Sequence, residues 1–524
     1  MIPTRTARRW CLAMFLAVVP SRLAAQTASY EQLQTFSALL NQIRQSYVDS
    51  VGYPELVHAA VDGVLSSLDP HSRFVRADDA ARELAYDSGT LAGAGISLDV
   101  VDDVLTVLAV QPRGPSARAG VAAGDRVFTI NDTSVAGLNP EEAYRHILGE
   151  KGKKVRLTLL RGSRLEPDTV RVGVKLDFLQ ARSVGTVRMI DPTTGYVRLA
   201  EFQLKGGEEV KKAIGSLQSQ GARRLVLDLR NNPGGAVVAA VEIASLFLPA
   251  NSVVFRTVGR RRSANREFRT EGDGKFATLP LMVLIDQWSA SASEALVGTL
   301  QDHDRALVLG HRSFGKALEQ QLFPVPPQGD IVWLTVARIA TPSGRIIQRS
   351  YRGLKAAQYY SFAGTGGTAQ DTAEVFHTDH GRVVRGGGGL APDVELPATP
   401  PLPPWFSVAA DSNWIEAVSD SVAALLGKDD KARTAWSTAT ADWQTRLVQP
   451  LMARVDSRLG ISSQPSADLL ARLGRIMGGR AAEVRWGEDG YEDFAVRNDP
   501  GIRAAMTYWP QLDGLLSGQP VSKP

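Results

Sequence analysis

The chain has 524 residues, of which 44% are apolar and 22% are charged. These values are ordinary for a globular protein, so they exclude a disordered, collagen-like or disulfide-stapled chain, and the length suggests about three or four domains. The 59 basic and 55 acidic side chains leave a net charge of +4, which is weak support for a nucleic-acid partner.

The first 25 residues have the pattern of a secretory signal peptide. Arg5, Arg8 and Arg9 precede an apolar run, and Ala24 stands near its small-residue end. That run is too short for an ordinary membrane span, although an uncleaved anchor stays an alternative. Removing the leader takes away four basic residues and the single cysteine, Cys11, which leaves 55 charges of each sign. We therefore expect a periplasmic or secreted protein, membrane-anchored only if the leader is retained.

The next region, residues 26–84, is predicted to be helical. Apolar residues recur there at steps of three and four, namely Leu33, Phe36, Leu39, Leu40, Ile43 and Tyr47. Residues 85–174 then carry short alternating strands, for which we expect Val104–Val110, Arg126–Ile130 and Val155–Arg161. Between them Asn139 and Pro140 are typical of a helix start, which predicts a helix over Pro140–Leu148. These elements describe a small β-rich module.

Residues 175–399 alternate strands and helices. We expect strands at Leu225–Leu229, Leu281–Ile285 and Ala306–Leu309, with a helix over Val237–Leu248 after the first of them. This rhythm predicts a parallel sheet covered by helices, whose ligands bind at the carboxyl ends of the strands. The glycines of the turn at 231–235 and the serines of 289–293 both fall at those ends.

The rest of the chain offers no chemistry that we can identify. The proline-rich segment Pro392–Pro404 reads as a linker. A helical extension of unknown role is predicted for residues 400–524, because one helix face there gathers Trp414, Ile415, Val418, Val422 and Leu425.

The chemical candidates narrow to a serine cluster and one lysine. There is no His-Glu-x-x-His pattern and no cysteine besides Cys11, so we expect no metal and no cofactor. Serines 289, 291 and 293 follow a buried strand and open a helix, where unpaired N–H groups can face an oxyanion. Lys316 stands among apolar neighbours and would serve as a base if burial lowered its pKa. A serine helix cap and a surface lysine explain the same residues equally well.

Four pieces in this order resemble the C-terminal processing peptidases, a serine protease family with an embedded PDZ domain. They are Leu68–Ser72, Gly93–Arg161, Asp228–Gly235, and the nucleophile and base segments Ser289–Glu294, Leu300–Asp302 and Phe314–Lys316. The resemblance implies a multidomain α+β fold with N-terminal helices (26–84), a PDZ β-rich module (85–174), a crotonase-like α/β peptidase core (175–399) and a helical C-terminal extension (400–524).

The resemblance also implies roles for single residues. Ser291 would be the nucleophile, Lys316 its base and Gln320 the group that orients the lysine. The backbone N–H groups of Gly235 and Ala292 would bind the oxyanion. Asp302 would be structural, the flanking serines would cap or pack, and Glu294 would support the start of the helix.

In the PDZ module, Gly93, Ala94, Gly95 and Ile96 would form the loop that binds a peptide carboxylate, so that the peptide adds as a strand to the edge of the module. Leu148 stands where the family usually has arginine, so a gating step that needs this charge does not carry over.

We therefore expect a serine endopeptidase that cleaves proteins with apolar C-terminal tails and has no nucleic-acid partner; homo-oligomer formation is left open. One alternative is a catalytically silent PDZ-containing binding or scaffold protein. Another is a crotonase-like acyl-CoA enzyme, which the leader contradicts because such an enzyme would be cytoplasmic.

Overall fold

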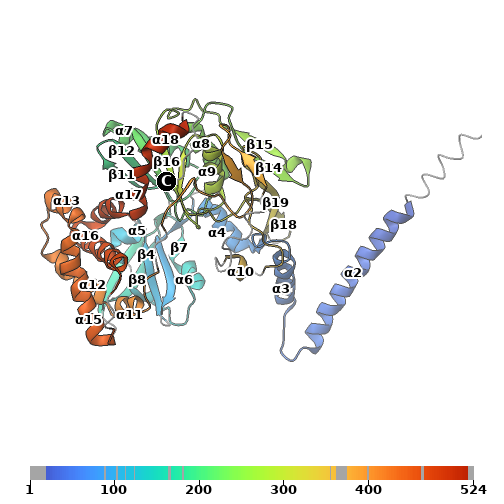
Figure 1. The fold of residues 1–524 in the computed structure, drawn as a ribbon. Coiled ribbons are helices and arrows are strands. Elements are labelled where there is room, and N and C mark those ends of the chain that lie inside the picture. Colours follow the sequence, from blue (N-terminus) through green and yellow to red (C-terminus); the bar gives the residue numbers. More distant parts are fainter. Residues whose placement is uncertain are drawn as a thin grey trace, which may run out of the picture. The chain divides into compact units, whose positions relative to one another are not determined.

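The computed structural model describes residues 19–87, 90–101, 104–111, 114–122, 124–162, 167–179, 182–327, 329–354, 356–360, 374–397, 401–461 and 465–516 (Figure 1). Most of the predicted leader, including Cys11, lies outside these residues. The chain divides into two compact units. The first consists of Met1–Ala77, Gln321–Thr335 and Tyr351–Phe362, and the second of Asp78–Gln320, Val336–Ser350 and Ala363–Pro524.

The first unit contains helices α2 (Val19–Ser46), α3 (Tyr53–Ser66) and α10 (Ala356–Tyr360) and strand β1 (Arg73–Val75). Helices α2 and α3 agree with the predicted helical pattern. The apolar face of α2 is nevertheless exposed in the described part of the chain, with Leu33 and Leu39 more than half accessible. The spacing of apolar residues thus predicted the helix, but it did not predict that its apolar face is exposed.

The motif Leu68–Ser72 forms a tight turn in the same unit. The Asp69 carboxylate accepts hydrogen bonds from the His71 N–H (2.8 Å) and from the Ser72 N–H and hydroxyl (2.8 and 2.7 Å). The His71 ring lies between the hydroxyls of Tyr359 (3.1 Å) and Tyr360 (3.2 Å) on α10. These bonds fix the exit from α3 and the start of β1, which pairs with the first part of β19 (Asp330–Ala340).

The second unit begins with α4 (Ala77–Asp87) and a β-rich module. Its antiparallel sheet has the order β3-β4-β5-β8-β9, with β6 paired to β5. The elements are β3 (Ile96–Val101), β4 (Val104–Val110), α5 (Pro115–Ala119), β5 (Arg126–Ile130), β6 (Thr133–Ser134), α6 (Pro140–Ile147), β8 (Lys154–Arg161) and β9 (Asp168–Lys175). A capping box between Asn139 and Glu142 starts α6, as the sequence indicates. Leu148 does not extend this helix.

Leu148 instead begins β7 (Leu148–Gly149), which joins β2 (Ala92–Gly93) and β10 (Asp177–Phe178) in a small sheet. This small sheet ties together the start and end of the β-rich module, because β10 leads out of it.

A six-stranded sheet forms the centre of the second unit. Its order is β11 (Val184–Asp191), β12 (Thr194–Leu199), β13 (Arg224–Asp228), β16 (Leu281–Ile285), β17 (Leu307–Gly310) and β22 (Val394–Glu395). Only β11 runs antiparallel to its neighbour; the other pairs are parallel. This is the predicted parallel sheet, with one antiparallel strand at its edge.

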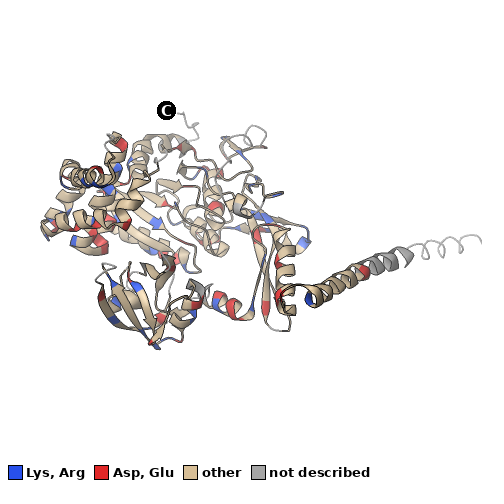
Figure 2. Ribbon diagram, turned by 90° about the horizontal axis from the view of Figure 1, so that it is seen from below, with Lys and Arg blue, Asp and Glu red and all other residues tan. Residues whose placement is uncertain are grey.

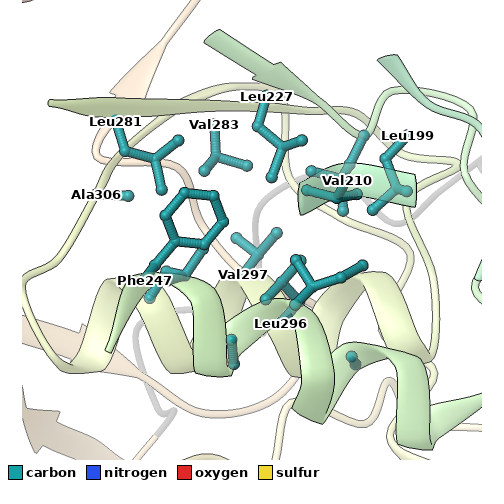
Figure 3. Packing of buried hydrophobic residues seen from close by; sticks show 14 of the residues in the cluster. Leu199, Val210, Leu227, Phe247, Leu281, Val283, Leu296, Val297 and Ala306 are labelled. Atoms are coloured by element: carbon teal, nitrogen blue, oxygen red, sulfur yellow. The ribbon is translucent and has the colours of Figure 1, made fainter. Parts of the chain in front are cut away.

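One face of this sheet packs on three helices, α7 (Gly206–Ser219), α8 (Val237–Phe247) and α9 (Ala292–Asp302). Figure 3 shows Leu281 and Val283 of the sheet above Phe247 of α8 and Val297 of α9. The side chains alternate along each strand, so every second residue points to this core.

The opposite face of the sheet is covered by the C-terminal helices. Met282 and Leu284 pack there with Ile502, Trp509 and Leu512. The helices of this extension are α11 (Trp405–Asp411), α12 (Trp414–Ala424), α13 (Asp430–Thr438), α14 (Thr440–Trp443), α15 (Gln449–Leu459), α16 (Ala467–Asn498), α17 (Pro500–Ala505) and α18 (Trp509–Leu516), with a π-helical turn at Gln444–Val448 and a 3-10 turn at Met506–Tyr508.

Two predictions for the C-terminal part are wrong in detail. Pro392–Pro404 is not only a linker, because Val394–Glu395 is strand β22 of the central sheet. Leu425 does not share the buried face of Ile415 and Val422, since it is 77% exposed. The remaining helices around α12 have a hydrophobic core of their own, centred on Trp436, Trp443 and Phe494.

A second sheet joins β14 (Val253–Gly259), β15 (Arg266–Arg269) and the latter part of β19, and β18 (Leu318–Val325) also pairs with β19. A hairpin of β20 (Val375–His377) and β21 (Val383–Arg385) and a 3-10 turn (Arg262–Ala264) complete the described elements. Basic and acidic residues are interspersed over these elements (Figure 2). No helix among the described residues is both long and apolar enough to cross a membrane.

Candidate active site

The turn that follows β13 is shaped by Asn232. Its side-chain amide donates to the Leu199 carbonyl (2.7 Å), and its amide oxygen accepts from the Gly234 N–H (2.9 Å). Gly234 has φ of +101°, and a Cβ there would lie 2.8 Å from Cβ of Ser291 and 2.9 Å from the nitrogen of Ala292. Glycine is therefore required, and the turn packs directly against the serine segment.

A buried ion pair holds the start of this turn. Asp228 is fully buried and accepts from the Tyr196 hydroxyl (2.8 Å) and from the Arg230 guanidinium (2.6 Å). Burial alone would raise the pKa of Asp228, but the charge and hydrogen bonds of Arg230 outweigh it and lower the pKa. Arg230 also reaches Asp499 between α16 and α17 (3.1 Å).

Ser291 stands directly before α9 in a backbone conformation that few residues adopt, with φ of 57° and ψ of −115°. Its neighbours hold it against the turn. The Ser289 hydroxyl donates to the Leu229 carbonyl (2.8 Å), while the Asn232 carbonyl accepts from the Ala290 N–H and the Ser293 hydroxyl (3.0 Å each). Strain of this kind persists only where the surroundings impose it, and it is common at catalytic sites.

Two backbone N–H groups beside Ser291 are available to a ligand. The Phe202 N–H donates to the Gly234 carbonyl, and the Phe202 carbonyl accepts from the Ala236 N–H. The N–H of Gly235, which lies between these two residues, takes part in neither bond. The N–H of Ala292 is the first of α9. Neither group has a hydrogen-bond acceptor within the part of the chain that the structure describes. Together with the positive end of the α9 dipole, they can stabilise a developing oxyanion.

Glu294 links the serine segment to the lysine segment. Its side chain is 1% exposed, and each carboxylate oxygen accepts two hydrogen bonds. Oε1 accepts from the Ser313 hydroxyl (2.5 Å) and the Gly315 N–H (2.6 Å), and Oε2 from the N–H groups of Lys316 (2.8 Å) and Ser291 (3.0 Å). Burial raises the pKa of Glu294, while these four donors favour its ionised form. The predicted nucleophile and base therefore meet, through their backbones, on one oxygen atom.

Lys316 and Gln320 lie near the start of β18, and both are half-buried. Gly315 before the lysine has φ of +88°, and a Cβ there would lie 2.9 Å from the nitrogen of Gly389. The segment is thus clamped between Glu294 and the glycine-rich stretch at Gly389, which limits the positions open to the lysine side chain.

The predicted peptide-binding loop has a more restricted geometry than the sequence suggests. Gly93 belongs to β2, and the Ala94 N–H donates to the Ile147 carbonyl (3.0 Å). Gly95 has φ of +70°, and Ile96 begins β3. A Cβ at Gly93 would lie 2.6 Å from a methyl group of Leu148, so Leu148 packs onto this loop.

Comparison with known proteins identifies the family. A model of peptidase family S41 matches residues 193–356, and a PDZ-domain model matches residues 106–161. A carboxyl-terminal-processing protease of Picosynechococcus sp. is 35% identical over 295 residues, which are 54% of this chain and 69% of that protein. A carboxy-terminal-processing protease of Bartonella bacilliformis is 34% identical over 331 residues, or 61% of this chain and 73% of that one. The chain belongs to peptidase family S41.

Among solved structures, the photosystem II D1 C-terminal processing protease is 26% identical, with a TM-score of 0.38 over 68% of this chain and 86% of that one. This chain is thus a carboxyl-terminal-processing serine protease of family S41 with a PDZ domain. The alternatives of a scaffold protein and an acyl-CoA enzyme are set aside by this assignment.

The sequence indicates only one of the four hydrogen bonds that Glu294 accepts in this S41 protease. The spacing Ser291-x-x-Glu294 is a capping-box pattern and signals its bond to the Ser291 N–H. No local pattern signals its bonds to Ser313, Gly315 and Lys316. Asp302 is buried against Arg345 (2.5 Å), in keeping with a structural role. No group of three His, Cys, Asp or Glu among the described residues could hold a metal ion.

Proposed function

We propose that this protease uses Ser291 as nucleophile and Lys316 as general base. The neutral amine of Lys316 accepts the hydroxyl proton as Oγ of Ser291 attacks the peptide carbonyl. The N–H groups of Gly235 and Ala292 stabilise the resulting oxyanion. The lysine then passes its proton to the leaving amine, an acyl-enzyme forms, and water releases it with Lys316 again acting as the base. Gln320 orients the lysine side chain.

The observation that carries this proposal is the shared carboxylate of Glu294. Ser291 and Lys316 are 25 positions apart in the sequence, yet their N–H groups bind the same oxygen. Ser291 also combines a strained backbone with two neighbouring N–H groups that have no acceptor among the described residues. Nucleophile, base segment and oxyanion donors are the parts that acyl transfer requires.

Substitution of the dyad tests the mechanism. Ser291→Ala should lower kcat on an unfolded protein substrate by at least about a thousandfold, and Lys316→Ala by a similar factor. The double variant should be no slower, because residues that act as a unit are non-additive. Cleavage is followed by mass spectrometry, and the folded state by circular dichroism. Ser219→Ala and Lys212→Ala, which change exposed residues of α7, are the matched controls. Cleavage by Ser291→Ala at the wild-type rate would contradict the dyad.

We further propose that the PDZ domain binds the apolar C-terminal tail of the substrate. An added peptide strand gains affinity from backbone hydrogen bonds and specificity from side-chain pockets. Because the Ala94 N–H is already bonded and Gly93 is held in β2, Gly95 and Ile96 are the residues of the loop best suited to meet the peptide carboxylate. A peptide with a C-terminal amide should therefore bind more weakly than the free acid.

We propose export through the leader of residues 1–25, and hence a periplasmic or secreted enzyme. The supporting features are the basic start, the short apolar run and the absence of cysteine after residue 11. Amino-terminal sequencing of the protein from its native compartment checks this, and a mature chain that begins at Met1 would contradict cleavage.

A further inference from the structure

The peptide groove of the PDZ domain has an edge strand and a helix as its walls. In the described chain β3 pairs with β4 alone, so its other edge is the one to which a peptide can add. Helix α6 lies along that edge, because its residue Tyr144 contacts β3. The backbone N–H groups of β3 that point toward α6 are therefore the groups that an added strand would use.

One of these N–H groups is already bonded. The Tyr144 hydroxyl accepts a hydrogen bond from the Leu98 N–H at 2.9 Å. Leu98 is buried, and the ring of Tyr144 packs against the hydrophobic core of the module. The tyrosine thus fills the place in which a peptide carbonyl would accept the same N–H.

Helix α6 is fixed at both ends around Tyr144. The capping box between Asn139 and Glu142 anchors its first turn. At the other end the Ile147 carbonyl accepts from the Ala94 N–H (3.0 Å), and the next residues pair with β2. A rotation of the Tyr144 side chain therefore opens the edge of β3 more readily than a movement of the whole helix.

We infer that Tyr144 sets the peptide affinity of this PDZ domain, because its hydroxyl competes with the peptide backbone for the Leu98 N–H. The ligand class is the C-terminal strand of a polypeptide, and this step rests on the proposed function of the domain. Binding requires a conformer in which the Tyr144 hydroxyl has left the Leu98 N–H. The smaller the population of that conformer, the weaker is the apparent affinity for the peptide.

The test is a measurement of peptide binding to the full chain. The Ser291→Ala background prevents cleavage, and the probe is a fluorescent peptide with an apolar C-terminus, followed by stopped-flow anisotropy. Tyr144→Phe removes the hydroxyl and keeps the ring. We expect it to bind the peptide about two- to tenfold more tightly, the range that one net hydrogen bond gives. The gain should lie in the association rate constant, with dissociation nearly unchanged. Tyr491→Phe, at a half-exposed position of α16, is the matched control.

Each outcome separates this inference from the proposed function. The proposed role of the PDZ domain would be overturned if neither the Ser291→Ala chain nor its Tyr144→Phe form bound the free-acid peptide better than the amidated peptide. Binding in the Ser291→Ala chain with no change on Tyr144→Phe would overturn only the competition by Tyr144. Weaker binding of the Tyr144→Phe variant would also overturn it, because the hydroxyl would then contact the peptide rather than exclude it.

Discussion

At the scale of single residues, Glu294 has a role that its position at the start of α9 only partly indicates. A buried carboxylate is costly unless it is fully hydrogen-bonded, and here two oxygens meet four donors. Two of the donors belong to Ser291 and Lys316. The side chain therefore sets the spacing between the two backbone segments that carry the proposed dyad.

Glu294→Gln should separate positioning from stability. An amide offers one acceptor oxygen and places an NH₂ group against two of the donors, so the two segments cannot both keep their places. We expect kcat to fall about a hundredfold, the typical cost of a small misplacement, while KM changes little. The rate of acylation of Ser291 by a serine-directed probe should fall by a similar factor.

Asp302→Asn is the control for this experiment. Asp302 is equally buried at the other end of α9 and pairs with Arg345. Its loss should lower the melting temperature without lowering kcat per folded molecule. A Glu294→Gln enzyme with lower stability but unchanged kcat would mean that Glu294 is only structural.

The sequence was sufficient to propose Ser291 and Lys316 as a dyad, because both lie in motifs that the family resemblance makes specific, and the dyad stays a prediction. Tyr144 and the second half of the Glu294 network could not be predicted. Their partners, Leu98 and Lys316, are far from them in the sequence, so only the folded backbone brings the donor and acceptor together.

At the scale of elements, strands with a strong apolar signal were predictable and the others were not. β16 is a continuous run of five apolar residues whose side chains enter the two cores of the central sheet in turn, and its bounds match the prediction. β19 is mostly half-buried on both sides, so it has no period-two signal. β22 is only two residues long, and Asp393 holds its start by accepting from the Val308 N–H (2.9 Å) and from Gln301 (2.9 Å).

The hairpin of β11 and β12 gives a pH-dependent prediction. Asp191 accepts four hydrogen bonds from the N–H groups and hydroxyls of Thr193 and Thr194 (2.8–2.9 Å). Burial would raise its pKa, but these bonds and Arg224 lower it from 3.8 to about 2. The stabilisation by ionised Asp191 is thus complete above pH 4 and is lost as the pH falls through 2, because the carboxyl is then protonated in the folded state as well as in the unfolded state.

Asp191→Asn should therefore lower the free energy of unfolding by about 1 kcal/mol at neutral pH. The difference from wild type should shrink between pH 4 and pH 2, as measured by urea unfolding at each pH. A difference that stays constant over this range would show that ionisation of Asp191 does not contribute to stability.

At the scale of the whole molecule, the C-terminal extension is part of the enzyme's core. The second face of the central sheet is buried by residues of α17 and α18, including Trp509 and Leu512. The helical character of this extension was predictable from periodicity. Its attachment to the sheet was not, because apolar residues on a helix do not say which surface they cover.

Leu512→Ala should test this attachment. Leu512 is fully buried, so its truncation should cost about 2–5 kcal/mol of unfolding free energy through lost contacts and a cavity. Chemical denaturation measures the change. Leu425→Ala, at an exposed position of the same extension, should stay within about 0.5 kcal/mol of wild type. Equal stabilities of the two variants would mean that α18 does not contribute to the core.

The cover formed by α17 and α18 has a consequence for the order in which the enzyme matures. During synthesis, the strands and all of the proposed catalytic residues leave the ribosome long before Leu512 does. Until then Met282 and Leu284 have no partner helix, and a sheet with one apolar face in water is only marginally stable. We therefore expect the nascent chain to stay incompletely folded, and proteolytically inactive, until α17 and α18 have been made.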